Sequence, residues 1–202
     1  MKRILFIHVM ALCCALQSQA QSFRTVTFSG NSSDFNAAEK YTAQGTSQNT
    51  DYYVTFDASN LYIGAFRTGG STFGGSDNFA IYIDTDPASP ASGGTGTTVG
   101  QSYNSVSGTL PFTANYNVHA EQSYQEARSF GSTWASTISG VTYWTSTTAR
   151  EVKIPFSSIG SPDALYLTMW MGYASGFFAN APGANIAATT NPTITGYIGG
   201  FG

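Results

Sequence analysis

Alternation of apolar and polar residues is the dominant pattern along this chain. In residues 165–171 four aliphatic side chains fall on one side, and Tyr166, Thr168 and Trp170 fall on the other. Because successive side chains of a strand point to opposite faces of a sheet, this pattern predicts a strand with one buried face. The same period of two recurs in residues 23–28, 52–57, 61–66, 77–84, 116–119, 124–130, 141–144 and 150–154.

The connections between these segments are typical of an all-β domain. Ser59-Asn60 predicts a tight turn that joins residues 52–57 and 61–66 into a hairpin. Only residues 155–159 predict a helical turn, and residues 193–198 predict a closing strand. We therefore expect a two-sheet antiparallel β-sandwich, jelly-roll or immunoglobulin-like in outline, with about eight to eleven strands.

The first twenty residues have the pattern of a signal peptide. Lys2 and Arg3 precede an apolar run, and Ser18-Gln19-Ala20 supplies the small residues that a signal peptidase requires. Both cysteines of the chain, Cys13 and Cys14, lie in this segment. The prediction is a secreted single domain of residues 21–202 without disulfides, located outside the cell, in the periplasm or at the cell surface, and not inserted in a membrane after cleavage.

The net charge of the chain after signal-peptide cleavage bears on which ligands it can bind. Loss of Lys2 and Arg3 with the signal peptide leaves 6 basic against 11 acidic residues, a net charge of −5. Nucleic-acid phosphates normally meet a surplus of Lys and Arg, so we expect no nucleic-acid partner. Charged residues make up 9% of the chain and aromatic residues 14%, a composition that favours sheets over helices or disorder.

Four segments resemble a known group of β-sandwiches. Residues 30–39, 53–63, 77–86 and 150–160 are similar to the opening, the hairpin, the Asp-bounded strand and the Pro-containing element of DOMON-like domains, which include family-nine carbohydrate-binding modules. The resemblance implies the same fold and a saccharide ligand. It departs from the group's pattern at Phe56, where a tryptophan is usual.

Aromatic residues are the leading binding candidates. If residues 77–84 and 165–171 bury their aliphatic faces, Tyr82 and Trp170 project to the far side, with Tyr62 as a further member. Trp134 and Trp144, on either side of a turn, are alternative binders. Flat rings on an open sheet can stack on sugar rings. The alternative is that loops or termini cover this second face, since aromatic residues usually pack in cores.

No cofactor is expected except Ca²⁺. Asp84 and Asp86 are candidate calcium ligands, because Ca²⁺ takes carboxylate oxygens from loops. The same Asp-x-Asp pattern also suits an ordinary strand-to-turn transition. His119 with Met169 or Met171 has the residue types of a haem ligand pair, but both methionines fall on the expected core face.

The sequence contains none of the common catalytic motifs that we sought, and we expect no enzyme. Glu121, Glu126 and Glu151 are the nominees if a carboxylate pair for glycoside hydrolysis exists. The predicted function is non-catalytic binding of an extracellular polysaccharide or oligosaccharide. A structural or adhesive surface protein is the alternative, and a glycoside hydrolase or its accessory domain is the third.

Overall fold

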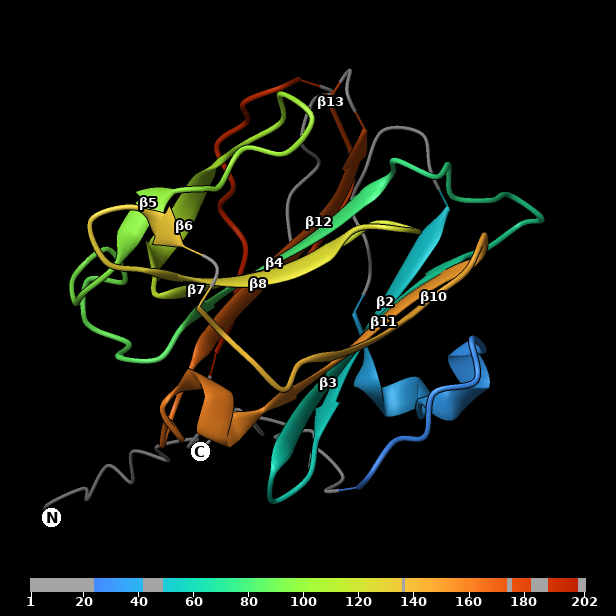
Figure 1. Ribbon diagram of the computed structural model, residues 1–202, viewed down its shortest axis with the longest axis horizontal. Coiled ribbons are helices and arrows are strands. Elements are labelled where there is room, and N and C mark those ends of the chain that lie inside the picture. The colour runs from blue at the N-terminus through green and yellow to red at the C-terminus, as the bar shows by residue number, and fades with distance from the viewer. Residues whose placement is uncertain (1–23, 42–48, 136, 174–175, 183–188, 200–202) are drawn as a thin grey trace, which may run out of the picture.

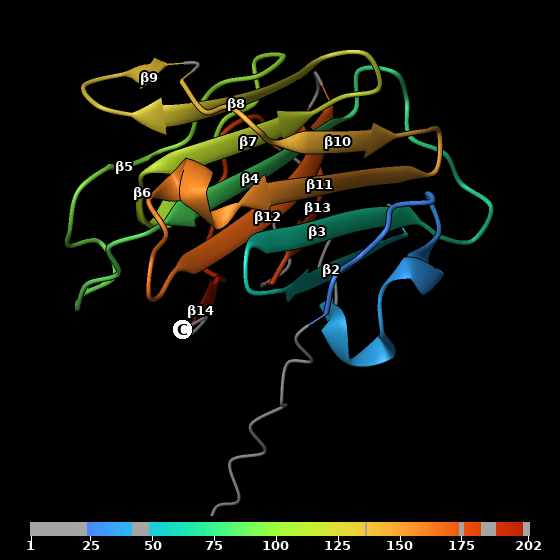
Figure 2. The same ribbon diagram turned by 60° about the horizontal axis from the view of Figure 1, so that its bottom comes forward.

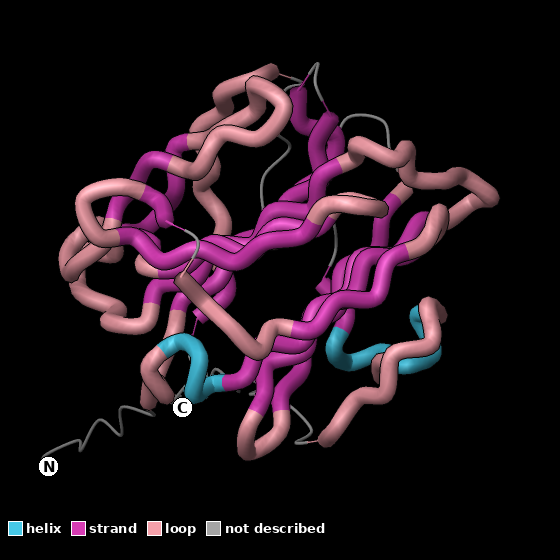
Figure 3. Tube along the Cα trace, in the orientation of Figure 1, coloured by secondary structure: helices cyan, strands magenta, loops and turns pink. Residues whose placement is uncertain are grey.

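The computed structural model describes residues 24–41, 49–135, 137–173, 176–182 and 189–199. These form an all-β sandwich of two large antiparallel sheets (Figures 1 and 3). Sheet A has the order β1 (Lys40–Tyr41), β2 (Thr50–Phe56), β3 (Asn60–Arg67), β11 (Ala149–Pro155) and β10 (Thr142–Thr145). Sheet B has the order β13 (Gly176–Ala181), β12 (Tyr166–Tyr173), β4 (Asn78–Asp84), β7 (Tyr116–Ala120), β8 (Gln125–Phe130) and β9 (Trp134–Ala135), with β14 (Ile198–Gly199) beside β12.

The predicted sandwich is confirmed, and its main core lies between the two sheets. Val54, Ile63 and Val152 point inward from sheet A, and Ile81 and Met169 point inward from sheet B. All five are fully buried. Burying one such side chain contributes about 1.5–3 kcal/mol, so these alternating strands stabilise the sandwich without any cysteine in the described residues. Residues 1–20, with the predicted signal peptide, lie outside the described residues.

The N-terminal segment covers the outer face of sheet A. Residues 24–39, here called the strap, contain the short 3₁₀ turns η1 (Ser32–Asp34) and η2 (Ala37–Glu39), drawn in blue in Figure 1. The predicted strand at residues 23–28 is wrong, because residues 24–28 lie across the sheet instead of pairing at its edge. Their alternation packs Val26 and Phe28 onto the outer face, so an extended cover gives the same period of two as a strand.

A second cover lies on the outer face of sheet B. It consists of residues 97–114, which include β5 (Thr97–Val99) and β6 (Thr109–Ala114), and we call it the β5–β6 layer. Leu110 and Phe112 are buried against Tyr82 and Trp170 of the sheet. The molecule therefore has an outer cover on each side of the sandwich, as the two views in Figures 1 and 2 show.

The helical prediction is confirmed at η3 (Phe156–Ile159), a 3₁₀ turn. The predicted closing strand at residues 193–198 is reduced to β14 and one bridge from Thr193 to Thr109. Among the described residues, no helix is long and apolar enough to cross a membrane.

The cover on sheet B makes a stability prediction. Trp170 is 1% exposed and stacks on Tyr82 with ring centroids 4.6 Å apart. Trp170→Ala should lower the free energy of unfolding in urea by about 3–5 kcal/mol, because it leaves a cavity between sheet and cover. The control is Val99→Ala, which removes a side chain that is 65% exposed and should cost less than about 0.5 kcal/mol. Equal losses in the two variants would contradict the layered core.

Candidate functional site

The expected open platform on sheet B does not form. Tyr82 is 0% exposed and donates a hydrogen bond from its hydroxyl to the Gln101 carbonyl, 3.0 Å away in the covering layer. Trp170 is buried beside it. The expectation that these two rings are exposed is therefore wrong. The physical reason is that the β5–β6 layer buries its own Leu110 and Phe112 against the same surface.

Trp134 closes the edge of this second core. Its ring meets Tyr82 edge-on at 5.8 Å and Phe130 at 5.3 Å. The indole Nε1–H donates to the Val99 carbonyl at 3.1 Å. Both the ring face and the polar atom are thus engaged within the fold, which leaves Trp134 half-buried and poorly placed to stack on a ligand.

Tyr62 and Trp144 come together on the other outer face, at a groove of about 390 Å³. The groove runs between the beginning of the strap and β10, at one edge of sheet A. The pairing of β3 with β11 and of β11 with β10 sets Tyr62, Lys153 and Thr142 side by side across three strands. The lining residues are Thr25, Val26, Thr27, Phe28, Tyr62, Thr142, Tyr143, Trp144 and Lys153.

Asp57 accepts hydrogen bonds from two residues that line the groove. Its Oδ2 accepts hydrogen bonds from the Tyr62 hydroxyl at 2.6 Å and from Thr25 Oγ1 at 2.9 Å. Its Oδ1 accepts the backbone N–H groups of Ser59 and Asn60 at 2.8 Å. Burial alone would raise the pKa of Asp57, but these hydrogen bonds outweigh it and lower the pKa to about 2. The carboxylate therefore holds the strap against the sheet.

Tyr62 supports the groove more than it lines it. The ring is 1% exposed, because Val26 and Phe28 of the strap pack over it, with Phe28 edge-on at 6.1 Å. Burial and the adjacent Asp57 raise the Tyr62 pKa to about 12. Trp134 and Trp144 are both partly buried, and of these two only Trp144 lines the groove.

The position of Trp144 depends on Gly30. The strap crosses the indole at Gly30 with a φ of +83°, and a Cβ there would overlap the six-membered ring. The Gly30 N–H donates to Glu151 Oε2 at 2.8 Å. Glu151 is paired with Trp144 across β11 and β10, so the same backbone turn covers the ring and satisfies the acid beside it.

Glu151 is a buried acid beneath the strap. Burial raises its pKa to about 8, and the neighbouring Asp34 carboxyl raises it further, while the bond from Gly30 opposes the shift. The side chain is 0% exposed. The buried carboxyl group therefore favours its neutral form, and its Oε2 accepts the Gly30 N–H of the strap.

The two calcium candidates lie at the end of β4, away from the groove. Asp84 is fully buried, and its Oδ1 accepts the Asp86 N–H at 2.9 Å. Burial and the adjacent Asp86 raise the Asp84 pKa to about 7. Asp86 itself accepts Thr95 N–H and Oγ1–H at 2.9 and 2.7 Å. Within the described part of the chain, no three metal-ligating side chains gather in one place, and calcium binding stays a prediction.

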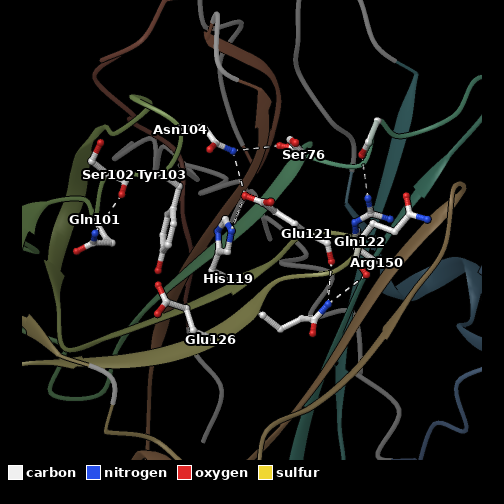
Figure 4. Close-up of polar contacts among 12 residues, drawn as sticks. Ser76, Gln101, Ser102, Tyr103, Asn104, His119, Glu121, Gln122, Glu126 and Arg150 are labelled. Atoms are coloured by element: carbon white, nitrogen blue, oxygen red, sulfur yellow. Dashed lines mark hydrogen bonds and ion pairs between the residues drawn. The ribbon is translucent and has the colours of Figure 1, made fainter.

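The three candidate catalytic glutamates lie on two different sheets. Glu121 and Glu126 lie with β7 and β8 of sheet B, whereas Glu151 lies on sheet A. Figure 4 shows His119 between Tyr103 and Glu121, where His119 Nε2 is 3.2 Å from Glu121 Oε1. Glu126 Oε1 accepts Arg128 Nε–H at 2.7 Å. Glu151 therefore forms no carboxylate pair with the other two.

His119 and the two core methionines cannot hold one haem. His119 projects from β7 toward Tyr103 of the outer cover, with ring centroids 3.6 Å apart. Met169 and Met171 project from β12 into the core between the sheets. The two sets therefore lie on opposite faces of sheet B.

Comparison with protein-family models, with curated proteins and with solved structures finds no match for this chain. The resemblance to DOMON-like sandwiches therefore remains a prediction from the four sequence segments, and the site must be interpreted from its own geometry.

The buried acid of the strap makes a prediction about pH. The folded pKa of Glu151 lies above its ordinary value of 4.5, so its stabilising effect is complete below that pH and is lost as the pH rises through about 8. Glu151→Gln keeps an acceptor for the Gly30 N–H but cannot ionise. In urea unfolding at pH 9 the variant should be more stable than the parent by about 1–3 kcal/mol, and this advantage should vanish at pH 4.

Glu126→Gln serves as the control of opposite sign. Burial alone would raise the pKa of Glu126, but hydrogen bonds from Arg128 and two tyrosines lower it to about 2. Its stabilising effect is thus present at neutral pH and lost as the pH falls through that value. Glu126→Gln should be less stable than the parent at pH 7. If Glu151→Gln were also less stable than the parent at neutral and high pH, Glu151 would not be a buried neutral acid in the folded protein.

Proposed function

We propose that this chain is a secreted, non-catalytic carbohydrate-binding domain whose ligand occupies the groove between the strap and β10. The observation that carries the proposal is the partly buried ring of Trp144, fixed by Gly30 and flanked by threonine hydroxyls in a groove of about 390 Å³. That volume falls in the range of small-molecule sites, which combine apolar walls with a few oriented polar groups.

The lining suits the chemistry of a sugar ring. A pyranose has an apolar face of C–H groups, which packs on an aromatic ring, and a rim of hydroxyls, which needs donors and acceptors. Trp144 and Phe28 supply the first kind of contact, and Thr25, Thr27 and Thr142 supply the second. Because the lining offers only a few ring contacts and association costs several kcal/mol, we expect a Kd of about 10 µM to 1 mM.

The groove favours binding without hydrolysis. Its described lining contains no carboxylate, and glycoside hydrolysis usually requires two. Glu151 is close in the sheet but is 0% exposed beneath Gly30. A bound saccharide would therefore meet hydroxyls, rings and one ammonium group, and no acid–base pair.

The burial of Tyr82 and Trp170 favours a second candidate, a structural or adhesive surface protein. Two of the aromatic residues expected to bind ligand serve the core instead. The outer strand β10 also ends sheet A, and sheet ends can pair with another chain. A protein of this kind would associate with itself or with a surface while binding no soluble saccharide.

Trp144→Ala tests the proposal directly. A panel of soluble neutral and acidic oligosaccharides is titrated into the protein, and tryptophan fluorescence and calorimetry report binding. The variant should lose at least about tenfold in affinity for any saccharide that the parent binds, because it loses the stacking ring. Trp134→Ala, a second half-buried tryptophan in the other half of the molecule, should bind as the parent does.

Circular dichroism and the Tm of both variants show whether the fold persists. If the parent binds no saccharide of the panel yet forms oligomers, the adhesive function replaces the proposed one. If Trp134→Ala abolishes binding and Trp144→Ala does not, a saccharide site exists at a different place from the groove.

A further inference from the structure

Lys153 lies at the floor of the groove, in the middle of a row of three outward-facing residues. It projects from β11 between Tyr62 of β3 and Thr142 of β10, which are its partners in the two ladders. Its neighbours along the strand, Val152 and Ile154, point into the core. The lysine is half-buried and lines the groove together with Trp144.

In the part of the chain that the structure describes, this ammonium group has no carboxylate partner. All eleven Asp and Glu residues belong to the described part of the chain, and none of them forms an ion pair with Lys153 there. The exposed Lys40 shows the contrast, because its Nζ lies 2.7 Å from Asp51 Oδ2. Arg24 likewise pairs with Glu39 at 3.0 Å.

The carboxylate that binds two of the lining residues is already occupied by donors of the protein. Asp57 accepts hydrogen bonds from Tyr62, Thr25, Ser59 and Asn60. Its oxygens are turned to the protein's own donors. The polar character that the groove offers to a ligand therefore comes from one cation and from threonine hydroxyls.

We propose that the groove selects acidic saccharides, with a uronic-acid carboxylate against Lys153 Nζ and the pyranose face on Trp144. This inference rests on the proposed function and names its ligand class. The chain has a net charge of −3, so an unpaired lysine gives the groove a charge opposite to that of the protein as a whole. A half-buried ammonium gives a charge-assisted hydrogen bond to a carboxylate, which is stronger than a neutral one, and it supplies selectivity between charged and uncharged sugars.

A matched pair of ligands tests the inference: trigalacturonate and its methyl ester, which has the same ring framework without the charge. Calorimetric titration of the purified protein should show the acid binding about tenfold more tightly than the ester. That preference should shrink when the salt rises from about 0.01 M to about 1 M, because the Debye length falls from about 30 Å to about 3 Å.

Variants of single lysines test whether the preference for the acid depends on Lys153. Lys153→Gln should remove the preference for the acid, so that the acid and the ester bind this variant with similar affinity, and Lys153→Arg should retain most of the preference. Lys40→Gln makes the same change of charge at the opposite edge of sheet A. This variant should keep the preference for the acid over the ester.

The outcomes separate the two proposals. If neither the acid nor the ester binds, and the panel of neutral sugars also fails, the proposed function falls. If the ester binds as tightly as the acid, or Lys153→Gln keeps the preference, the saccharide site stands and the acidic specificity is overturned. Tighter binding of a sulfated galactan oligosaccharide with the same Lys153 dependence would overturn the choice of a carboxylate.

Discussion

Each sheet of this sandwich has apolar side chains on both faces, and the outer covers follow from that constraint. Sheet A presents Tyr53 and Phe66 away from the central core, and sheet B presents Tyr82 and Trp170. Left bare, each face would be a large exposed apolar surface. The strap and the β5–β6 layer bury these faces, so the aromatic residues that look available in the sequence are used by the fold. The proposed ligand site lies beside one of these covers, between residues 25–28 of the strap and β10.

Two buried acids of the sandwich accept a backbone N–H group. Glu151 accepts the Gly30 N–H of the strap, and Asp84 accepts the Asp86 N–H at the loop that leads to β5. Burial raises the pKa of both acids, to about 8 and about 7 respectively. At Asp84 the donor is only two residues along the chain, whereas at Glu151 the donor belongs to the strap, so the acid of sheet A is the one that holds a cover in place. The shape of the groove depends on this, because Gly30 also fixes the ring of Trp144.

Local pattern was enough to predict the sandwich and most of its strands. Period-two alternation identifies a strand and the residues that share a face, as at Val152 and Ile154. It does not tell what covers the opposite face, and for this reason Tyr82 and Trp170 were wrongly expected to be exposed. It also cannot separate a strand from an extended cover, so residues 23–28 were assigned to a sheet.

The groove itself depends on contacts that are distant in sequence. Tyr62 and Trp144 were candidates from the start, but their common site arises from the strand order β3–β11–β10 and from the strap. Lys153 was missed because a single lysine on a strand face is ordinarily a solvated charge. The signal that identifies it is the ladder position between Tyr62 and Thr142, which requires the topology.

The three tryptophans allow the most direct test of where the ligand binds. Trp144 lines the groove, Trp134 closes the edge of the second core, and Trp170 is buried within it. In a nitrogen-15 NMR titration with a saccharide that binds, we expect the indole N–H signal of Trp144 to shift and the signals of Trp134 and Trp170 to stay in place. A shift of Trp134 or Trp170 with an unmoved Trp144 would contradict the assignment of function to the groove.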